Sequence, residues 1–512
     1  MQKKQTILVV ASLLVVVLSV TLAYFTAQII GKGKNVTINS ADLKIIFTDS
    51  DGSISGTNIE PGKWNVTKTF TIENKSNETY KYNIVIQNLV NTFVTNGYLQ
   101  YKITSTNGGY NMTEFKDVPK SETATDTILA YSASIDVGVT QTYTVQFIYK
   151  NDEEVDQSED MGKKLSGKLF ITEGTKEPVT LLSQILNDNP TRSTRSSNNN
   201  GTNDFATPLT TTTTGTLFTS TESITGITDS PKEVYYYAGN TTNNWVKFAG
   251  FYWRIIRTNH DGSIRLLYVG ISPDTTYSYI VSSTFNNPDK SPKYVGYKYG
   301  EDTSLDTIRN NTTDSNIKTH IDTWYKDNLI NYTKYLSTSA VYCNDRSLGT
   351  GQTYSTSSKF NFASYYRMDY DTKGAKANPS YNCTDIRDAF SVDNTSAKLD
   401  YPISLMTADE IVFAGGVAYT KMNTPYAWFQ SNSVGTEVST YWWSLSPTHW
   451  SGSGSVVWDW VTADLGLSGD YVDNAYLVRP AISLKSCIKY GAGNGSAETP
   501  YEIVETSSGC WW

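Results

Sequence analysis

Short runs in which polar and apolar residues alternate fill residues 33–173, and Gln141–Ile148 is one example. This period of two predicts half-buried antiparallel strands, and no helical pattern longer than two turns interrupts it. Asp-Gly, Pro-Gly and Gly-Gly turn signals separate the runs. We therefore expect residues 33–173 to form an antiparallel β-sandwich of about seven strands.

Residues 233–505 combine hairpin and helix patterns. Aromatic and aliphatic runs flank Asp261-Gly262, which predicts a tight hairpin. Apolar positions at helical spacing predict a helix over Ile317–Leu329, and the capping box Thr407–Glu410 predicts the start of a second helix. We expect an α+β domain here, so that the whole chain is multidomain and mainly β.

Residues 174–232 are rich in Thr, Asn and Ser. One apolar piece, Val179–Leu186, predicts a brief helix, and polar tracts such as Ser196–Gly201 follow it. Tracts this polar bury too little apolar surface to offset the entropy lost on ordering them. The segment is therefore interpreted as a polar linker between two domains.

The amino terminus has the pattern of an export signal. Two lysines precede an apolar run of about fourteen residues that begins at Ile7. Residues 1–23 are predicted to be a signal peptide cleaved between Ala23 and Tyr24. Extension of the run to Phe25 gives about nineteen residues, enough to cross a bilayer, so an uncleaved membrane anchor is the alternative. Both alternatives predict an extracellular protein, either secreted or held at the cell surface.

Composition narrows the possible classes of function. Lys and Arg number 42 against 50 Asp and Glu, and the net charge of −8 disfavours nucleic acid as a partner. Aromatic residues make up 13% of the chain, which argues against global disorder. The three histidines, His260, His320 and His449, stand far apart in sequence, which disfavours histidine-built metal sites and triads. We expect a non-catalytic protein without a cofactor.

All four cysteines lie in the C-terminal half of the chain. An even number in an exported protein predicts two disulfides. Three pairings are possible, and the pairing of Cys343 with Cys383 and of Cys487 with Cys510 is favoured because each closes a loop of modest length. A reactive redox pair is the alternative, and the wide spacing disfavours it.

The densest group of aromatic residues lies between Tyr426 and Trp460. Flat rings offer faces on which sugars stack, although most tryptophans with strand patterning fill the core. The Gly/Ser-rich segment Thr448–Ser455 is typical of a surface loop, where recognition tends to reside. The candidate ligand-binding residues are two tryptophans with a neighbouring histidine and two aspartates: Trp450, Trp458, His449, Asp459 and Asp464.

No metal site is predicted. Residues 49–60 have the spacing of a helix-loop-helix calcium loop, but Ile54 stands where that loop needs glycine, so a hairpin turn is favoured. A weak Ca²⁺ site around Asp369 and Asp371 is the remaining alternative.

Several segments near the amino terminus carry a family resemblance: Leu22–Thr26, Ile59–Gly62, Thr69–Asn74 and Tyr80–Ile86. They resemble the leader, strands and turns of the camelysin/TasA-type exported proteins of Gram-positive bacteria. The resemblance implies a leader that a dedicated signal peptidase removes, in a family that includes biofilm-fibre subunits. Camelysin relatives have been labelled metallopeptidases, but this part of the chain has no histidine and no His-Glu-x-x-His string.

A second resemblance runs through the C-terminal half, in Tyr252–Ile256, Tyr342–Ser347, Ser404–Glu410, Tyr441–Pro447 and Leu477–Leu484. These segments look like an uncharacterised domain of exported Firmicutes proteins. That domain is similar in fold to C-type lectins and to sulfatase-modifying (formylglycine-generating) proteins. The resemblance implies a fold and does not supply an activity.

Together the patterns favour a non-catalytic cell-surface or secreted protein of a Gram-positive bacterium. It would be an adhesin or matrix component that binds glycan or an extracellular protein through its lectin-like module. The alternative is a structural biofilm-fibre subunit that self-assembles through its N-terminal sandwich, with the segment after Ala23 adding as a strand to the next sheet edge. An uncharacterised extracellular enzyme is the third hypothesis. Membrane contact is expected only through the leader.

Overall fold

The computed structural model describes residues 35–40, 43–49, 53–56, 59–76, 78–175, 179–197, 203–273, 278–420, 441–461, 466–506 and 509–510. Strands account for 40% and helices for 13%, which confirms that the fold is mainly β. The chain divides into two compact units, Met1–Glu177 and Pro178–Trp511, called the N-terminal unit and the C-terminal unit below. The predicted cleavage site at Ala23 and Tyr24 lies outside the described residues.

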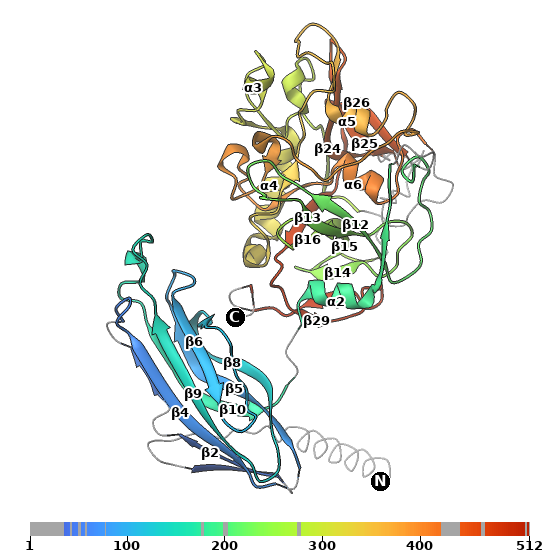
Figure 1. Cartoon of the computed structure of the whole chain (residues 1–512). Helices are drawn as coiled ribbons and strands as arrows, with labels where there is room; N and C mark the ends of the chain where they lie inside the picture. Colours follow the sequence, from blue (N-terminus) through green and yellow to red (C-terminus); the bar gives the residue numbers. More distant parts are fainter. Residues whose placement is uncertain are drawn as a thin grey trace, which may run out of the picture. The chain divides into compact units, whose positions relative to one another are not determined.

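Two antiparallel sheets form the N-terminal unit (Figure 1). The first sheet has the order β1-β2-β4-β9-β6-β7, and the second has the order β3-β10-β5-β8. Their strands are β1 (Asn35–Ser40), β2 (Leu43–Asp49), β3 (Ser53–Gly56), β4 (Asn65–Asn74), β5 (Tyr80–Asn91), β6 (Leu99–Ser105), β7 (Lys116–Asp117), β8 (Ser121–Ile135), β9 (Thr140–Tyr149) and β10 (Leu165–Glu173).

One hydrophobic core joins these two sheets. Phe70 and Ile72 of β4 are buried in it together with Ile84 and Ile86 of β5. Phe70 also stacks on Tyr143 of β9, with ring centroids 4.9 Å apart. The apolar residues of the alternating pattern are therefore the inward-facing ones, as the period of two requires.

The largest sheet of the C-terminal unit has ten strands, some of them paired in parallel. Its main path runs β11-β12-β13-β15-β14-β30-β29, and β16, β28 and β23 continue it beyond β15. The strands are β11 (Thr191–Thr194), β12 (Thr216–Glu222), β13 (Lys232–Tyr236), β14 (Trp245–Phe248), β15 (Phe251–Thr258), β16 (Ile264–Gly270), β23 (Ile403–Leu405), β28 (Pro480–Leu484), β29 (Tyr490–Ala492) and β30 (Tyr501–Ile503).

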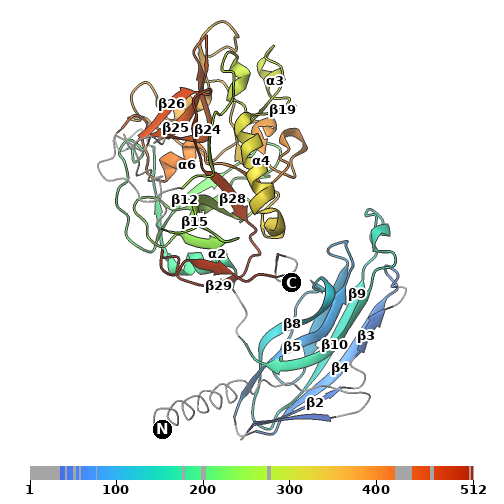
Figure 2. The same ribbon diagram turned by 180° about the vertical axis from the view of Figure 1, so that it is seen from behind.

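A second sheet of six strands lies above the first in the view of Figure 2. Its order is β17-β27-β24-β25-β26, with β21 paired to β24. The strands are β17 (Val281–Ser283), β21 (Phe360–Asn361), β24 (Tyr441–Trp450), β25 (Ser455–Val461), β26 (Gly466–Tyr471) and β27 (Tyr476–Val478). Two short pairs complete the strands: β18 (Lys298–Tyr299) with β19 (Thr313–Asp314), and β20 (Tyr342–Cys343) with β22 (Ala389–Phe390).

Short helices connect and cover these sheets. The α-helices are α2 (Leu181–Asp188), α3 (Leu305–Ile308), α4 (Asn316–Asn328), α5 (Ala363–Arg367) and α6 (Ala408–Phe413). Short 3₁₀ helices are η1 (Ser158–Asp160), η2 (Pro292–Val295), η3 (Ile330–Tyr335), η4 (Ile386–Asp388) and η5 (Thr395–Ala397). The helix predicted over Ile317–Leu329, the helix start at Thr407 and the hairpin at Asp261-Gly262 are all confirmed. In the described part of the chain, no helix is both long and apolar enough to span a bilayer.

The interpretation of residues 174–232 as a linker is wrong for most of the segment. Helix α2 buries Leu181 and Ile185 in the core of the C-terminal unit. Strand β12 pairs with β13, and Phe218 stacks on Tyr236 with ring centroids 5.4 Å apart. A few apolar residues at the correct spacing are sufficient to order this segment. The prediction missed them because Thr and Asn dominate its composition. The C-terminal unit therefore begins at Pro178 rather than near residue 233.

Both disulfides lie within the C-terminal unit. Cys343 is bonded to Cys383 and Cys487 to Cys510, with Cα atoms 5.8 and 5.4 Å apart, respectively. This is the favoured pairing. Each bridge joins positions that are close in sequence, at separations of 40 and 23 residues.

Candidate functional site

The two tryptophans predicted to form a binding surface lie in the core instead. Trp450 is 2% exposed and Trp458 is 0% exposed. The indole Nε1 of Trp458 donates a hydrogen bond to Ser364 Oγ at 3.3 Å, beneath α5. The Gly/Ser segment is a tight turn between β24 and β25, and these strands carry both rings into the interior. The prediction of an exposed tryptophan surface is therefore wrong.

The other candidate residues do not form one surface either. His449 on β24 is partly exposed, whereas Asp459 on β25 is fully buried. Trp458 and Asp459 are successive residues of one strand, so their side chains point to opposite faces of the sheet. Asp464 lies outside the described residues. Of the five predicted residues, His449 is the one described residue that reaches the surface.

An exposed tyrosine lies close to His449. Tyr366 of α5 is 41% exposed, and its hydroxyl accepts hydrogen bonds from Gln352 Nε2 at 2.9 Å and Asn361 Nδ2 at 3.2 Å. Asn361 lies directly opposite His449 in the pairing of β21 with β24. A Cβ at Gly349 would come within 2.1 Å of the Tyr366 ring, so only glycine leaves space for this orientation. The ring is thus held in a fixed orientation at the surface.

Further aromatic residues support this surface from behind. Tyr365 stacks on Tyr370 with ring centroids 4.4 Å apart, and Tyr370 contacts Tyr419 at 4.8 Å. The imidazole of His449 lies edge-on to Tyr365 and Tyr370. Burial, followed by the positive charge of Lys359, lowers the pKa of His449 to about 4, so the ring is neutral at pH 7. We call the set Tyr366, Tyr370, Tyr419, His449, Gln352 and Asn361 the Tyr366 surface.

The Tyr366 surface combines a flat exposed ring with neutral polar groups. Gln352 Nε2 and Asn361 Nδ2 lie at the edge of the ring, where both donate to its hydroxyl, whereas Asn361 Oδ1 and His449 Nδ1 are buried without a hydrogen-bond partner among the described residues. An aromatic face with a few polar atoms around it is suited to sugars, whose C–H groups stack and whose hydroxyls hydrogen-bond. No sequence signal separates the buried Tyr365 from the exposed Tyr366, since neighbouring residues of one helix are both buried elsewhere in this unit, as in α6.

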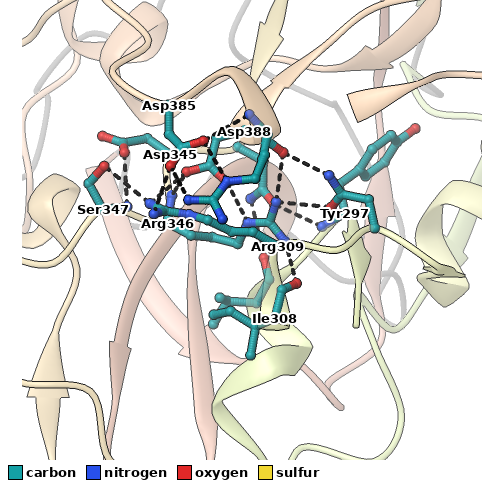
Figure 3. Close-up of polar contacts among 12 residues, drawn as sticks. Tyr297, Ile308, Arg309, Asp345, Arg346, Ser347, Asp385 and Asp388 are labelled. Carbon is teal, nitrogen blue, oxygen red and sulfur yellow. Dashed lines mark hydrogen bonds and ion pairs between the residues drawn. The ribbon is translucent and has the colours of Figure 1, made fainter. Parts of the chain in front are cut away.

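A buried cluster of charged residues lies deeper in the C-terminal unit (Figure 3). Arg346 is 0% exposed, and its Nε donates to Asp388 Oδ1 at 2.7 Å. The remaining guanidinium nitrogens of Arg346 donate to backbone carbonyls that include Ile308, at 2.9 Å, and to Asn311. Arg309 donates to Asp388 and Asp385. Arg309 also donates to the Ser347 hydroxyl at 3.3 Å. Both arginines are thus engaged by neighbouring loops, which indicates that the cluster orders these loops.

A second buried cluster surrounds the start of α6. Arg257 forms ion pairs with Glu222 at 2.8 Å and with Glu410 at 2.7 Å. Arg367 forms ion pairs with Asp345 at 2.7 Å and with Asp409 at 2.9 Å. The cavity between these groups has a volume of about 20 Å³, which is room for one water molecule. A substrate does not fit there.

Three carboxylates approach one another closely enough to suggest a metal ion: Asp314, Asp322 and Asp400. The ammonium group of Lys318 lies among them, however, at 3.1, 2.5 and 2.6 Å. The lysine therefore supplies the positive charge that a metal would bring. The three carboxylates compensate the charge of Lys318, whose side chain is 0% exposed.

The aspartates considered for Ca²⁺ are engaged in local hydrogen bonds. Asp371 accepts the hydroxyl hydrogen of Tyr365 at 2.7 Å, and Asp369 accepts the backbone N–H of Lys376 at 2.7 Å. These contacts are typical of carboxylates that fix a turn. Calcium at this turn stays a prediction.

Comparison with known proteins provides no relative. The chain matches no family model, no curated protein and no solved structure.

Proposed function

We propose that the chain is a non-catalytic extracellular protein of a Gram-positive bacterium, an adhesin or matrix component that binds glycans through the Tyr366 surface. On this proposal the C-terminal unit is a C-type-lectin-like module, and the N-terminal unit is a camelysin/TasA-like sandwich exported by a leader. Two disulfides within one unit are in keeping with an oxidising compartment.

The observation that carries the proposal is the fixed orientation of the Tyr366 ring. A large exposed ring normally loses rotational freedom when it binds a ligand, at a cost of about 0.5–1.5 kcal/mol. The hydrogen bonds from Gln352 and Asn361 restrict that freedom before binding. Because Tyr366 lies on α5 and Asn361 on β21, regular elements position the ring and one of its two hydrogen-bond donors.

A glycan array probed with the full chain tests this function. We expect saturable binding that Tyr366→Ala lowers by about two- to tenfold, since a stacked ring contributes about 0.5–1.5 kcal/mol. Tyr471→Ala is the matched control, because Tyr471 is equally exposed at 42% but its hydroxyl takes part in no hydrogen bond among the described residues. Binding that survives Tyr366→Ala, or equal losses in both variants, would contradict the proposal.

Self-assembly through the N-terminal unit is the second candidate function. Strand β8 has 15 residues and stands at the edge of its described sheet, with β5 as its neighbour. An edge this long can accept a strand from another chain, although the register shifts between β5 and β8 make the edge irregular. Electron microscopy of the full chain should show fibres that Ala124→Pro in β8 removes. A chain that stays monomeric at high concentration contradicts this function.

A further inference from the structure

A cavity of about 270 Å³ lies in the N-terminal unit, between the segment that joins β5 to β6 and the segment that joins β7 to β8. Four buried residues form its floor: Asn91, Phe93, Leu99 and Val118. The polar atoms of Asn91 are engaged within the wall, because its Nδ2 donates to the carbonyls of Val118 and Pro119 and its Oδ1 accepts from Phe93 N. The floor therefore presents mainly apolar surface.

The rim of the cavity is polar and reaches solvent. Asn96 and Asp117 are exposed, and Thr95, Gly97 and Lys120 are partly exposed. A ligand thus has an open path from solvent to the apolar floor.

Hydrogen bonds fix the rim on both sides. Val94 N donates to Asp160 Oδ1 at 2.6 Å, and Val94 O accepts from Lys120 Nζ at 2.6 Å. Gly97 N donates to Asp117 Oδ2 at 3.0 Å. The cavity is therefore formed before a ligand arrives, as most small-molecule sites are.

The two charged groups of the rim differ in what they offer a ligand. Both carboxylate oxygens of Asp117 already accept hydrogen bonds, from Gly97 N and from Gln100 Nε2, at 3.0 Å each. The Lys120 ammonium has three N–H donors and uses one of them for Val94 O, and no described carboxylate forms an ion pair with it. Lys120 therefore offers a positive charge and hydrogen-bond donors at the mouth of the cavity.

An apolar floor with a cation at its edge favours an organic anion that has an apolar body. The apolar body displaces water from a floor that gives water few hydrogen bonds. The ammonium group then binds the charged end through a charge-assisted hydrogen bond and orients the ligand. Drug-sized ligands occupy cavities of about 300–1,000 Å³, so this cavity suits a smaller ligand with one ring or a short alkyl chain.

We propose that this cavity binds a small organic anion, with the apolar body on Phe93 and Leu99 and the charged end at Lys120. Binding is reversible, and no covalent bond forms or breaks. The site belongs to the N-terminal unit, so it is separate from the Tyr366 surface and does not depend on the glycan function.

Ligand-observed NMR titrations of the full chain test this site. The probe is 3-phenylpropionate, with 3-phenylpropan-1-ol as the neutral analogue and 3-phenylpropylammonium as the cationic one. We expect the anion to bind with a millimolar or lower Kd and the alcohol to bind about fivefold more weakly, as loss of a hydrogen bond to a partly exposed charge implies. The ammonium analogue should bind more weakly than the alcohol, because Lys120 repels it.

A pair of lysine variants locates the charged end. Lys120→Gln is expected to weaken phenylpropionate binding about fivefold and to leave the Kd of the alcohol unchanged. Lys102→Gln is the matched control and should leave both unchanged. Lys102 is also partly exposed and its ammonium also donates to a backbone carbonyl, that of Thr113 at 2.8 Å, but it does not line the cavity.

Two further variants locate the apolar body. Leu99→Phe extends the floor into the cavity and should weaken the anion and the alcohol alike by about tenfold, with an unchanged near-ultraviolet circular dichroism spectrum. Tyr366→Ala should bind phenylpropionate as the native chain does. The proposal is overturned if phenylpropionate does not bind, if Lys120→Gln binds it as tightly as Lys102→Gln, if either analogue binds as tightly as the anion, or if Tyr366→Ala abolishes binding.

Discussion

His449 shows how one partly buried imidazole makes stability depend on pH. It is neutral in the folded chain because burial and Lys359 lower its pKa to about 4, against about 6.5 in an unfolded chain. Between these two values the unfolded chain binds a proton that the folded chain does not bind. Folding is therefore favoured above about pH 6.5, and this contribution is lost as the pH falls toward 4.

We predict that proton NMR will give His449 a titration midpoint near pH 4, with His449→Gln used to assign the resonance. The difference from the unfolded value corresponds to about 3 kcal/mol of unfolding free energy. In urea titrations, the free energy of unfolding should fall less between pH 7 and pH 4.5 for the His449→Gln variant than for the native chain. A midpoint near pH 6.5 would mean that the imidazole is open to water.

At the scale of elements, contacts in its first turn stabilise α6, because a helix of six residues has few hydrogen bonds of its own. Thr407 accepts a hydrogen bond from Glu410 N, and the Glu410 side chain accepts one from Thr407 N. The same Glu410 forms ion pairs with Arg257 and Arg265, while Asp409 binds Arg367. One helix start thus connects two arginines of the β15–β16 hairpin with Arg367 of α5.

Removal of the Glu410 carboxylate should therefore cost more than removal of the cap. We expect Glu410→Ala to lower the unfolding free energy by about 3–5 kcal/mol, because Arg265 is left without its carboxylate partner at 0% exposure. Thr407→Ala should cost about 1 kcal/mol, since it removes one cap hydrogen bond. Denaturant titrations of both variants check this order. Equal losses would show that the ion pairs add nothing beyond the cap.

The sequence predicted those helices and hairpins whose own residues carry the signal, either a capping residue at the start or a regular spacing of apolar positions. Apolar positions at helical spacing located α4, and the capping box Thr407–Glu410 located the start of α6. The tryptophans of β24 and β25 were misplaced because these strands are buried on both faces, so alternation could not separate core from surface. The pairing of Arg346 with Asp388 spans 42 residues, and no spacing rule reveals such a contact. The orientation of Tyr366 likewise depends on Gly349.

At the scale of the whole molecule, the two units have separate hydrophobic cores and different covalent support. Among the buried residues described, one core is made of residues between Phe70 and Ile171, and the main core of the other begins at Leu181. All four cysteines lie in the C-terminal unit. Closing loops of 40 and 23 residues restricts its unfolded chain by about 4 and about 3 kcal/mol in the loop-entropy account.

Reduction should therefore destabilise one unit and leave the other unchanged. We expect calorimetry of the full chain to show two unfolding transitions, of which dithiothreitol lowers one. Tryptophan fluorescence identifies that transition, because Trp64 is the one tryptophan before Pro178 and the signal reports mainly the C-terminal unit. The transition followed by fluorescence should move to lower temperature on reduction, while the second transition stays in place. A single transition that moves as a whole would contradict the independent unfolding of the two units.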